Sequence, residues 1–489
     1  MIIPDYIRKI VKDLRAANYE AYIVGGCVRD FLMNKEPQDW DITTNARPEQ
    51  ILEVFSGAKY ENEFGTVLYP IRHQANNRET ADKPSETLID VVEITTYRSE
   101  QNYVDRRHPE IVRFETELDK DLERRDFTIN ALALDPEKPE EIIDLFGGRK
   151  DLKLKIIRAV GEPSDRFKED ALRMLRAVRF SAQLGFELEP KTQRAIFKLA
   201  GSLKFISPER IRDELIKILS SSRPSEGILL LHDTKLLQYI LPELEQGVDV
   251  KQDRHHIYPV FKHNILALKY CPSSGWPVRL AALLHDVAKP KTRKIIKGIA
   301  TFYNHEYLGA KMTERIMSRL KFSNEDRGRV VNLVKNHMFY YNVGEVTAAS
   351  VRRLIVKTGK DNLQDLIHLR VADRLGSGTP KAMPYKLRHL QYMLESVQND
   401  PVSVKMLKIN GHDLMSALKL EPGPKIGAVL DVLLAEVIED PERNTIEQLM
   451  PAAKKLAELD LAELRHRAKN IIADKRVEED KKIKKQFKV

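Results

Sequence analysis

Two acidic residues one position apart, Asp39 and Asp41, are the first candidates for chemistry in this sequence. We expect a strand here, and side chains at positions i and i+2 of a strand point to the same face. Both carboxylates can then converge on one divalent cation, and Mg²⁺ takes oxygen ligands of this kind together with substrate phosphates. An Asp-x-Asp pair alone is most often a solvated turn. The residues around it decide between such a turn and a metal site.

The residues before this pair favour phosphate binding. Gly25 and Gly26 follow the apolar run 22–24 and let the backbone approach a triphosphate closely. The helix that we expect next offers free N–H groups to an anion, and Arg29 adds a fixed charge one turn into it. The order of strand, glycine turn, short helix with a cation and acidic strand suits nucleotidyl transfer.

Gly25-Gly26-x-x-Arg29-Asp30 followed by Asp39-x-Asp41 resembles the head of the class II tRNA nucleotidyltransferases and bacterial poly(A) polymerases, within the polymerase-beta-like superfamily. The runs 123–131 and 166–176 resemble later motifs of that family, in the same order. The resemblance implies template-independent, Mg²⁺-dependent addition of CCA to the 3′ end of tRNA from CTP and ATP.

A two-metal mechanism usually needs a further carboxylate to act on the attacking 3′-hydroxyl. The strand that we expect over 88–94 offers Asp90 and Glu93, which face opposite sides of the sheet. The resemblance places the acid in the setting Val-Glu-x-Thr-Thr-x-Arg, residues 92–98, and so favours Glu93. Asp90 can instead end a buried strand or cap a turn.

Nucleotide contacts are expected from two later clusters. In the first, guanidinium groups suit phosphate oxygens, while Asp and Asn suit ribose hydroxyls. As a bare string it would be a solvated helix face, but the resemblance implies ribose and triphosphate binding. Its members are Arg124, Arg125, Asp126 and Asn130.

The second cluster, Asp170 and Arg173, stands at i and i+3 of a helix expected near 164–184, where the two side chains can hold each other. The resemblance implies that this pair reads the base edge, so that the protein selects C or A without a nucleic-acid template. The alternative is an ordinary surface pair. Arg176 and Arg179 are expected to supply phosphate or structural contacts.

A different pattern lies further along the chain, where His263, the pair His285-Asp286 and Asp373 resemble the metal ligands of the HD superfamily. Imidazole and carboxylate ligands suit Mn, Fe, Ni or Zn better than Mg. His285 and Asp286 end an apolar run, where two polar groups are costly without partners. His305 and His337 either complete a second metal position or are plain loop residues.

The elements that must position these residues form an α+β chain. Strands and helices alternate before residue 147, and helical periodicity prevails after Lys150. We expect a polymerase-beta-like nucleotidyltransferase α/β head followed by an all-helical body with an HD domain. The expected domains are the head at 1–147, a helical neck and body for base selection and RNA binding at 148–250, the HD domain at 251–385, and a helical tRNA-binding region at 386–489.

Composition excludes several classes of protein. Of 489 residues, 42% are hydrophobic and 31% charged, as in soluble globular proteins. No apolar run approaches the roughly 18 residues of a membrane span, and the first residues lack a secretory signal. Cys27 and Cys271 offer neither a disulfide framework nor a cysteine zinc site. We therefore expect a cytoplasmic protein without a membrane partner.

Charge is unevenly placed. The net charge is +9, and residues 465–489 hold ten Lys or Arg against four Asp or Glu. A basic tail fits a polyanion, so beside a nucleotidyltransferase head it favours RNA over a merely solubilising end.

Several functions compete with CCA addition. A poly(A) polymerase or an A-adding tRNA nucleotidyltransferase would share all the head motifs. An HD-type metal-dependent phosphohydrolase, with the head serving only to bind, is the alternative of another class; a non-catalytic RNA-binding protein is disfavoured by the intact acidic motifs. The segment 103–110 resembles the loop that family members need for adding the terminal A, which argues against a CC-only enzyme.

Overall fold

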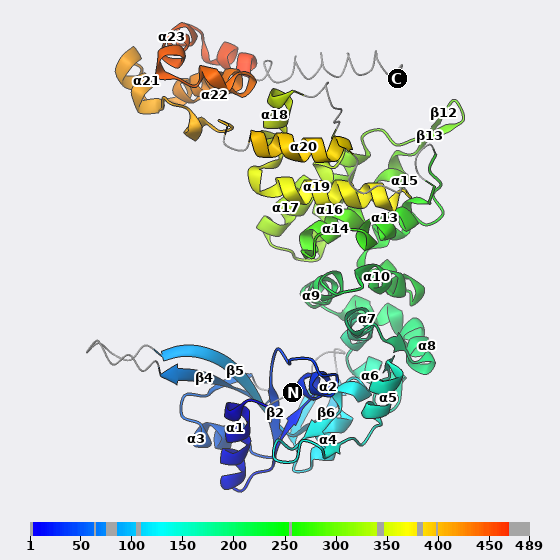
Figure 1. Cartoon of the computed structure of the whole chain (residues 1–489). Helices are drawn as coiled ribbons and strands as arrows, with labels where there is room; N and C mark the ends of the chain where they lie inside the picture. The colour runs from blue at the N-terminus through cyan, green and yellow to red at the C-terminus, as the bar shows by residue number, and fades with distance from the viewer. Residues whose placement is uncertain are drawn as a thin grey trace, which may run out of the picture. The chain divides into compact units, whose positions relative to one another are not determined.

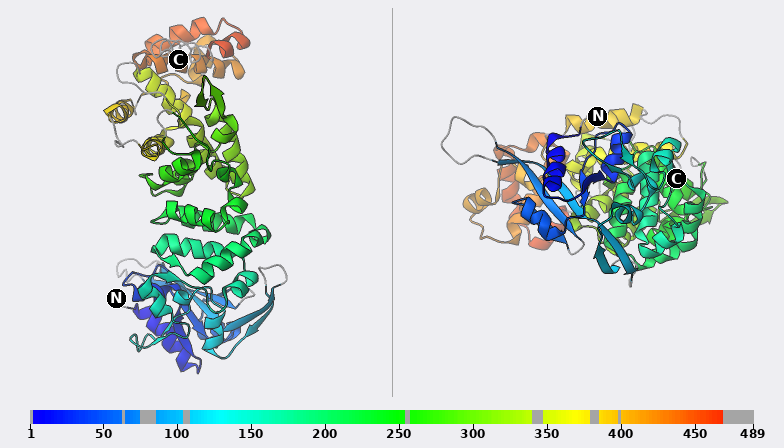
Figure 2. Two further views of the ribbon diagram at one scale, coloured as in Figure 1. Left: turned by 90° about the vertical axis from the view of Figure 1, so that its right-hand side faces the viewer. Right: turned by 90° about the horizontal axis from the view of Figure 1, so that it is seen from below.

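The computed structural model describes residues 3–62, 65–74, 86–103, 109–253, 257–339, 347–378, 385–397 and 400–468. The chain divides into two units, 1–248 with 316–323 and 249–315 with 324–489 (Figure 1). Figure 2 shows from two further directions that strands are concentrated near the N-terminus, while the later chain is almost entirely helical. No helix in the described ranges is both long and apolar enough to cross a bilayer.

A seven-stranded mixed sheet forms the head of the first unit. Strands β2 and β5 run parallel at its centre, and the other neighbours pair antiparallel. In spatial order the strands are β3 (Lys59–Asn62), β4 (Thr66–Gln74), β5 (Glu86–Thr96), β2 (Asp41–Thr44), β1 (Ala21–Val24), β8 (Ala133–Leu134) and β9 (Ile142–Ile143).

Helices and one hairpin complete the head. Helix α1 buries Ile7, Ile10, Val11 and Leu14, whose spacing makes one apolar stripe, in the core that the sheet shares. The other elements are α2 (Gly26–Leu32), α3 (Pro48–Val54), α4 (Leu118–Glu123), η1 (Thr128–Asn130), α5 (Gly148–Leu154), and the hairpin of β6 (Arg98–Tyr103) with β7 (Pro109–Phe114); α1 is Asp5–Ala16.

The strand expected over 88–94 is confirmed as β5, which pairs with β4 out to Gln74 opposite Glu86. Residues 75–85 of the loop expected between them lie outside the described residues, as do 104–108 of the loop proposed for A addition. Asp39 lies just before β2, which begins at Asp41, so the expected i and i+2 strand positions are wrong for Asp39.

The helical part of the first unit corrects one expectation. The single helix expected near 164–184 is two helices, α6 (Pro163–Glu169) and α7 (Leu172–Leu184). Asp170 between them is extended, with φ −137° and ψ 107°, and its carboxylate accepts a hydrogen bond from the Leu172 N–H at 2.9 Å. A short acidic side chain that bonds a following N–H ends one helix and starts the next.

The remaining elements of this unit are β10 (Ile156–Ile157), β11 (Glu187–Leu188), α8 (Pro190–Leu199), η2 (Ala200–Phe205), α9 (Pro208–Leu219), α10 (Pro224–Asp233), α11 (Leu237–Ile240) and α12 (Pro242–Glu245). Helix α9 begins at Pro208 after Ser207, because the fixed φ of proline suits the first turn of a helix.

In the second unit, helices α13, α14, α17 and α19 pack on one another. Helix α14 is buried along nearly its whole length, as expected of a helix that is apolar all round. The elements are α13 (Val260–Lys269), α14 (Trp276–Leu284), α15 (Lys289–Thr292), β12 (Lys294–Ile296), β13 (Ile299–Thr301), α16 (His305–Arg319), α17 (Asn324–Asn336), α18 (Ala348–Thr358), η3 (Lys360–Asn362), α19 (Leu363–Gly376), α20 (Tyr385–Ser396), η4 (Val404–Met406), α21 (Gly411–Leu418), α22 (Pro424–Glu439), η5 (Pro441–Arg443) and α23 (Ile446–Leu456).

Candidate active site and metal centre

Three of the predicted carboxylates gather at the centre of the head sheet. Asp41 opens β2 directly opposite Glu93 on the parallel strand β5. Burial raises the pKa of Asp41, and the charge of Asp39 raises it further, although Arg125 opposes both. Burial likewise raises the pKa of Glu93, with Asp41 as the next cause. Carboxylates that raise one another's pKa in this way repel each other when ionised, and a bound cation would relieve that repulsion.

Asp90, the alternative to Glu93, is engaged elsewhere. Its carboxylate accepts a hydrogen bond from the Tyr6 hydroxyl of α1 at 2.8 Å and another from the Val91 N–H at 2.8 Å. The strand alternation thus separates the two acids, as the sequence predicts, and the geometry favours Glu93.

The glycine turn lies beside these carboxylates. Gly25 has φ +87°, a backbone conformation that residues with a side chain rarely adopt. A Cβ at this position would lie 2.9 Å from Nη1 of Arg125 and 3.4 Å from Oδ2 of Asp41. The Gly25 turn, Arg125 and Asp41 therefore converge on one small volume. Gly26 follows as the first residue of helix α2.

A chain of hydrogen bonds joins α2 to α7. Nη1 of Arg29 donates to Oδ1 of Asn130 at 2.8 Å, and Nδ2 of Asn130 donates to Oδ1 of Asp126 at 3.1 Å. The other oxygen of Asp126 accepts from Nε of Arg176 at 2.7 Å. Burial alone would raise the pKa of Asp126, but Arg176 and Asn130 bring it down to about 2. This acid is a fixed anion.

Arg124 and Arg125 share an anion that sequence reasoning missed. Asp121 on α4 is fully buried and accepts from Nη2 of Arg124 at 2.7 Å and from Nη2 of Arg125 at 3.2 Å. The pKa of Asp121 is lowered, because the charges of the two arginines outweigh its burial. Its spacing of i to i+3 and i+4 from the arginines was the available signal.

The expected Asp170–Arg173 pair is wrong, because the helix break turns the two side chains to different partners. Nη1 of Arg173 pairs with Oε2 of Glu169 at 2.7 Å, and its Nη2 donates to the Arg124 carbonyl at 2.9 Å. Asp170 instead pairs with Nη2 of Arg210 on α9 at 2.7 Å. Arg173 therefore still contacts Arg124.

Arg176 and Arg179 differ in role. Arg179 is buried and pairs with Glu214 of α9 at 3.0 Å, so the structural alternative is favoured for it. Burial and then the charge of Arg176 lower the pKa of Arg179 to about 10. The guanidinium carbons of Arg29, Arg176 and Arg179 lie 5.4, 5.5 and 4.3 Å from the centre of the Phe180 ring. The sequence did not reveal that these three arginines share one aromatic contact.

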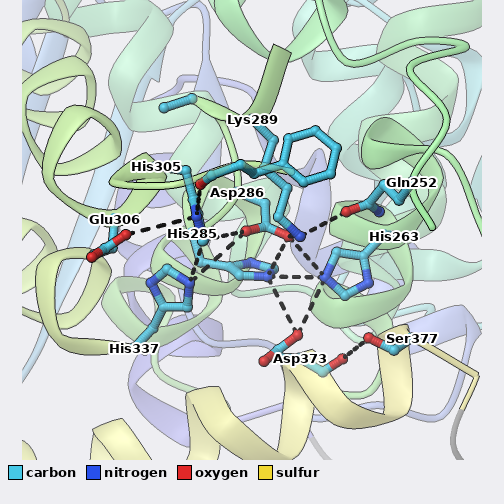
Figure 3. Close-up of polar contacts among 12 residues, drawn as sticks. Gln252, His263, His285, Asp286, Lys289, His305, Glu306, His337, Asp373 and Ser377 are labelled. Atoms are coloured by element: carbon cyan, nitrogen blue, oxygen red, sulfur yellow. Dashed lines mark hydrogen bonds and ion pairs between the residues drawn. The ribbon is translucent and has the colours of Figure 1, made fainter. Parts of the chain in front are cut away.

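The second unit brings together every predicted histidine and aspartate of the other pattern (Figure 3). Five of the six belong to two groups, within each of which the ligand atoms lie within 4.8 Å of one another, and these groups share Asp286: one adds His263 and His285, the other His305 and His337. Asp373 on α19 completes the first group, 3.4 Å from His263 Nε2. The plain-loop alternative for His305 and His337 is therefore disfavoured.

Asp286 bridges the two groups. Its Oδ2 lies 3.2 Å from Nε2 of His263 and 3.3 Å from that of His285, while its Oδ1 lies 3.2 Å from Nε2 of His305. A buried carboxylate with both oxygens turned toward imidazole nitrogens is the arrangement of a bridging metal ligand.

Backbone carbonyls orient the imidazoles. Nδ1 of His285 donates to Ala282 O at 2.8 Å, Nδ1 of His305 to Phe302 O at 2.7 Å, and Nδ1 of His337 to Val334 O at 2.7 Å. Such bonds select the tautomer whose Nε2 lone pair faces inward. Burial lowers the pKa of His337 to about 3, which keeps its imidazole neutral and able to ligate.

A cavity of about 790 Å³ opens onto this centre. Cationic side chains line it beside the ligands, and Nζ of Lys289 lies 2.6 Å from Oδ2 of Asp286. Its lining includes Asp286, Lys289, Phe302, Tyr303, Arg370 and Arg374. Imidazoles, buried carboxylates and nearby cations together suit a divalent metal and a phosphate.

Family models match most of the chain in three segments. Residues 21–158 match the poly A polymerase head domain. Residues 185–247 match the probable RNA and SrmB-binding site of polymerase A. Residues 294–453 match the putative domain 2 of tRNA nucleotidyltransferase.

Two named relatives match over most of their length. The CCA-adding enzyme of Lactiplantibacillus plantarum is 33% identical over 92% of this chain and 96% of its own. The A-adding tRNA nucleotidyltransferase of Deinococcus radiodurans is 37% identical over 65% of this chain and 74% of its own. The crystal structure of the Bacillus stearothermophilus CCA-adding enzyme in complex with CTP aligns with a TM-score of 0.66 and 27% identity, covering 92% of this chain and 97% of that one.

Proposed function

Since the chain belongs to the family of class II CCA-adding enzymes, we propose that it completes the 3′ end of tRNA with CTP and ATP and without a template. The observation that carries the proposal is the meeting of Asp41 and Glu93 on adjacent strands beside the Gly25 turn. A nucleotidyltransferase needs such acids where a triphosphate can approach.

In this proposal Asp39 and Asp41 hold Mg²⁺, which supplies charge neutralisation at the transferred phosphoryl group. Glu93 orients the 3′-hydroxyl of the tRNA and accepts its proton. Arg29, Arg124 and Arg125 bind the triphosphate, and Asp126 with Asn130 fixes the ribose. The hydrogen bonds that already hold these side chains in the free protein support this, since positioned groups lose little entropy on binding.

Base selection is assigned to Asp170 and Arg173. Each is held by a neighbour, Asp170 by Arg210 and Arg173 by Glu169, rather than by the other. A donor and an acceptor held separately present a fixed pattern to the Watson–Crick edge of C or A. U and G would then leave buried polar groups unpaired, which is costly.

The test is incubation of the protein with tRNA lacking CCA, tRNA lacking only the terminal A, and complete tRNA, each NTP being supplied separately. CCA addition predicts two C residues on the first substrate with CTP, one A on the second with ATP, and no addition to the last. An A-adding enzyme, the activity named for the Deinococcus relative, would extend only the second substrate. Long A tails would identify a poly(A) polymerase.

A second function is favoured by the histidine and aspartate centre. We propose that residues 251–385 form an HD domain whose centre holds two transition metal ions, Mn, Fe, Ni or Zn, and hydrolyses phosphate esters. The bridging position of Asp286 and the cationic cavity support this. Metal-dependent hydrolysis of p-nitrophenyl phosphate that is lost in Asp286→Asn but kept in Asp41→Asn would support it; no hydrolysis with any of the four metals would refute it.

A further inference from the structure

We propose that Asp121 is a positioning residue for nucleotidyl transfer, which keeps Arg124 and Arg125 on the triphosphate and keeps Arg125 off the metal ligand Asp41. This rests on the proposed roles of those arginines and of Asp41. Asp121 touches neither the substrate nor the metal in this proposal, and it acts through the two guanidinium groups.

The contacts of Asp121 show that both its oxygens are used. Oδ1 accepts from Nε and Nη2 of Arg124 at 3.0 and 2.7 Å. Oδ2 accepts from Nη2 of Arg125 at 3.2 Å and from the Thr43 hydroxyl at 3.3 Å. A charge buried to this degree is stable only with such partners, and here the partners are nucleotide-site residues.

Thr43 links this acid to the metal strand, because it stands two residues after Asp41 on β2. On the other side, the Arg124 carbonyl accepts a hydrogen bond from Nη2 of Arg173 at 2.9 Å. One buried carboxylate therefore joins the strand of the proposed metal ligands, the triphosphate arginines and the base-reading arginine.

Arg125 has a second anion within reach. The charge of Arg125 lowers the pKa of Asp41. Nη1 of Arg125 and Oδ2 of Asp41 also both lie near the position that a Cβ on Gly25 would occupy. Its Nε, moreover, is buried without a hydrogen-bond partner among the described residues. Once the charge of Asp121 is removed, the attraction of Arg125 to Asp41 is unopposed, and the guanidinium competes with Mg²⁺ for that carboxylate.

Asp121→Asn tests this, since the amide keeps the shape and the acceptor for Thr43 but loses the charge. Asp151→Asn is the matched control: Asp151 is also buried, accepts from the Thr128 hydroxyl at 2.7 Å and pairs with Arg158 at 3.0 Å, but touches no nucleotide-site arginine. Thermal unfolding of both variants measures the structural cost, and steady-state kinetics measures KM for CTP and for tRNA.

We expect Asp121→Asn to raise the KM for CTP and ATP roughly ten- to a hundredfold and to raise the Mg²⁺ concentration for half-maximal rate, with the KM for tRNA unchanged. Asp151→Asn should lose similar stability without either shift. If Asp121→Asn behaves like Asp151→Asn, the inference is wrong. Should Asp121→Asn not fold, Thr43→Val decides, with a smaller rise of both quantities expected and no rise overturning it.

A second pair of variants separates this inference from the proposed function. Arg124→Gln and Arg125→Gln should each raise the KM for CTP, because they remove the triphosphate contacts themselves. If these variants keep a normal KM, the assignment of the arginines fails. If they lose CTP affinity while Asp121→Asn does not, the assignment stands and the positioning role of Asp121 fails.

Discussion

Aspartates in the head differ in pKa because their neighbours differ. Asp41 faces two other acids, and its pKa is raised by burial and by Asp39. Asp126 is more deeply buried, yet Arg176 and Asn130 lower its pKa to about 2. The first carboxylate therefore gains from a bound cation, whereas the second already has its cation in the protein. This difference supports a metal role for Asp41 and a fixed, organising role for Asp126.

Replacing Asp41 by Asn should abolish incorporation of both C and A, because metal positioning and charge stabilisation supply most of the rate in phosphoryl-type transfer. Binding of tRNA, measured by gel shift, should remain largely intact. The control is Asp90→Asn, which removes a carboxylate of the neighbouring strand β5 that accepts a hydrogen bond from Tyr6 instead. Near-normal turnover of Asp41→Asn would contradict the metal assignment.

Asp126 should stabilise the head in a pH-dependent manner. The pKa of Asp126 in the folded protein is about 2, below the ordinary aspartate value of about 3.9 in the unfolded chain, so its ionised form favours folding by roughly 2 kcal/mol above pH 4. That contribution is lost as the pH falls from about 4 toward 2, because the unfolded chain then takes up the proton first.

Urea unfolding of the protein and of Asp126→Asn checks this. In a Trp276→Phe background the buried Trp40 of the head is the single tryptophan reporter. The difference in unfolding free energy between the two proteins should shrink as the pH is lowered from 5 toward 3. A difference that stays constant over this range would show that Asp126 does not carry the linkage.

At the scale of elements, the sequence predicts what local patterns determine. The apolar run over 88–94 predicted β5, and the helical periodicity after Lys150 predicted the mostly helical later chain. The break between α6 and α7 was missed because helical periodicity continues across Asp170, and only its bond to the Leu172 N–H reveals the new start. Arg210 and Glu214 were missed because tertiary packing sets their partners. Asp121 was missed because it lies within an unremarkable charged run.

The corrected pairing on α6 and α7 leads to a prediction about base choice. Glu169 holds Arg173 at 2.7 Å and Arg166 at 2.6 Å. Glu169→Gln should therefore loosen Arg173 and relax discrimination against UTP and GTP by roughly 1–3 kcal/mol, about ten- to a hundredfold. The measurement is kcat/KM for each NTP on tRNA lacking its last three nucleotides.

Asp165→Asn on the same helix is the matched control, because Asp165 pairs only with the exposed Lys168 among the described contacts. It should leave the preference for C over U unchanged. If Glu169→Gln also leaves that preference unchanged, the ion pair is structural and Arg173 is not held for base reading.

At the scale of the molecule, the two candidate sites belong to different units of the chain. The carboxylate cluster is built from β2 and β5 of the first unit, and the histidine centre from residues of the second. Each has its own core, such as the cluster of Ile23, Ile42 and Ile94 under the head sheet. The chemistry of one site therefore does not require that of the other.

The histidine centre should accordingly lose its metal without loss of CCA addition. Since Asp286 faces both ligand groups, Asp286→Asn should remove both proposed metal ions, whereas His337→Ala should remove only the one next to His305. Elemental analysis of purified protein measures the stoichiometry, and incorporation of CTP and ATP into tRNA measures the activity. Loss of incorporation in a variant that keeps its fold, judged by circular dichroism, would show that the sites are coupled. Equal metal content in the two variants would contradict the bridging role of Asp286.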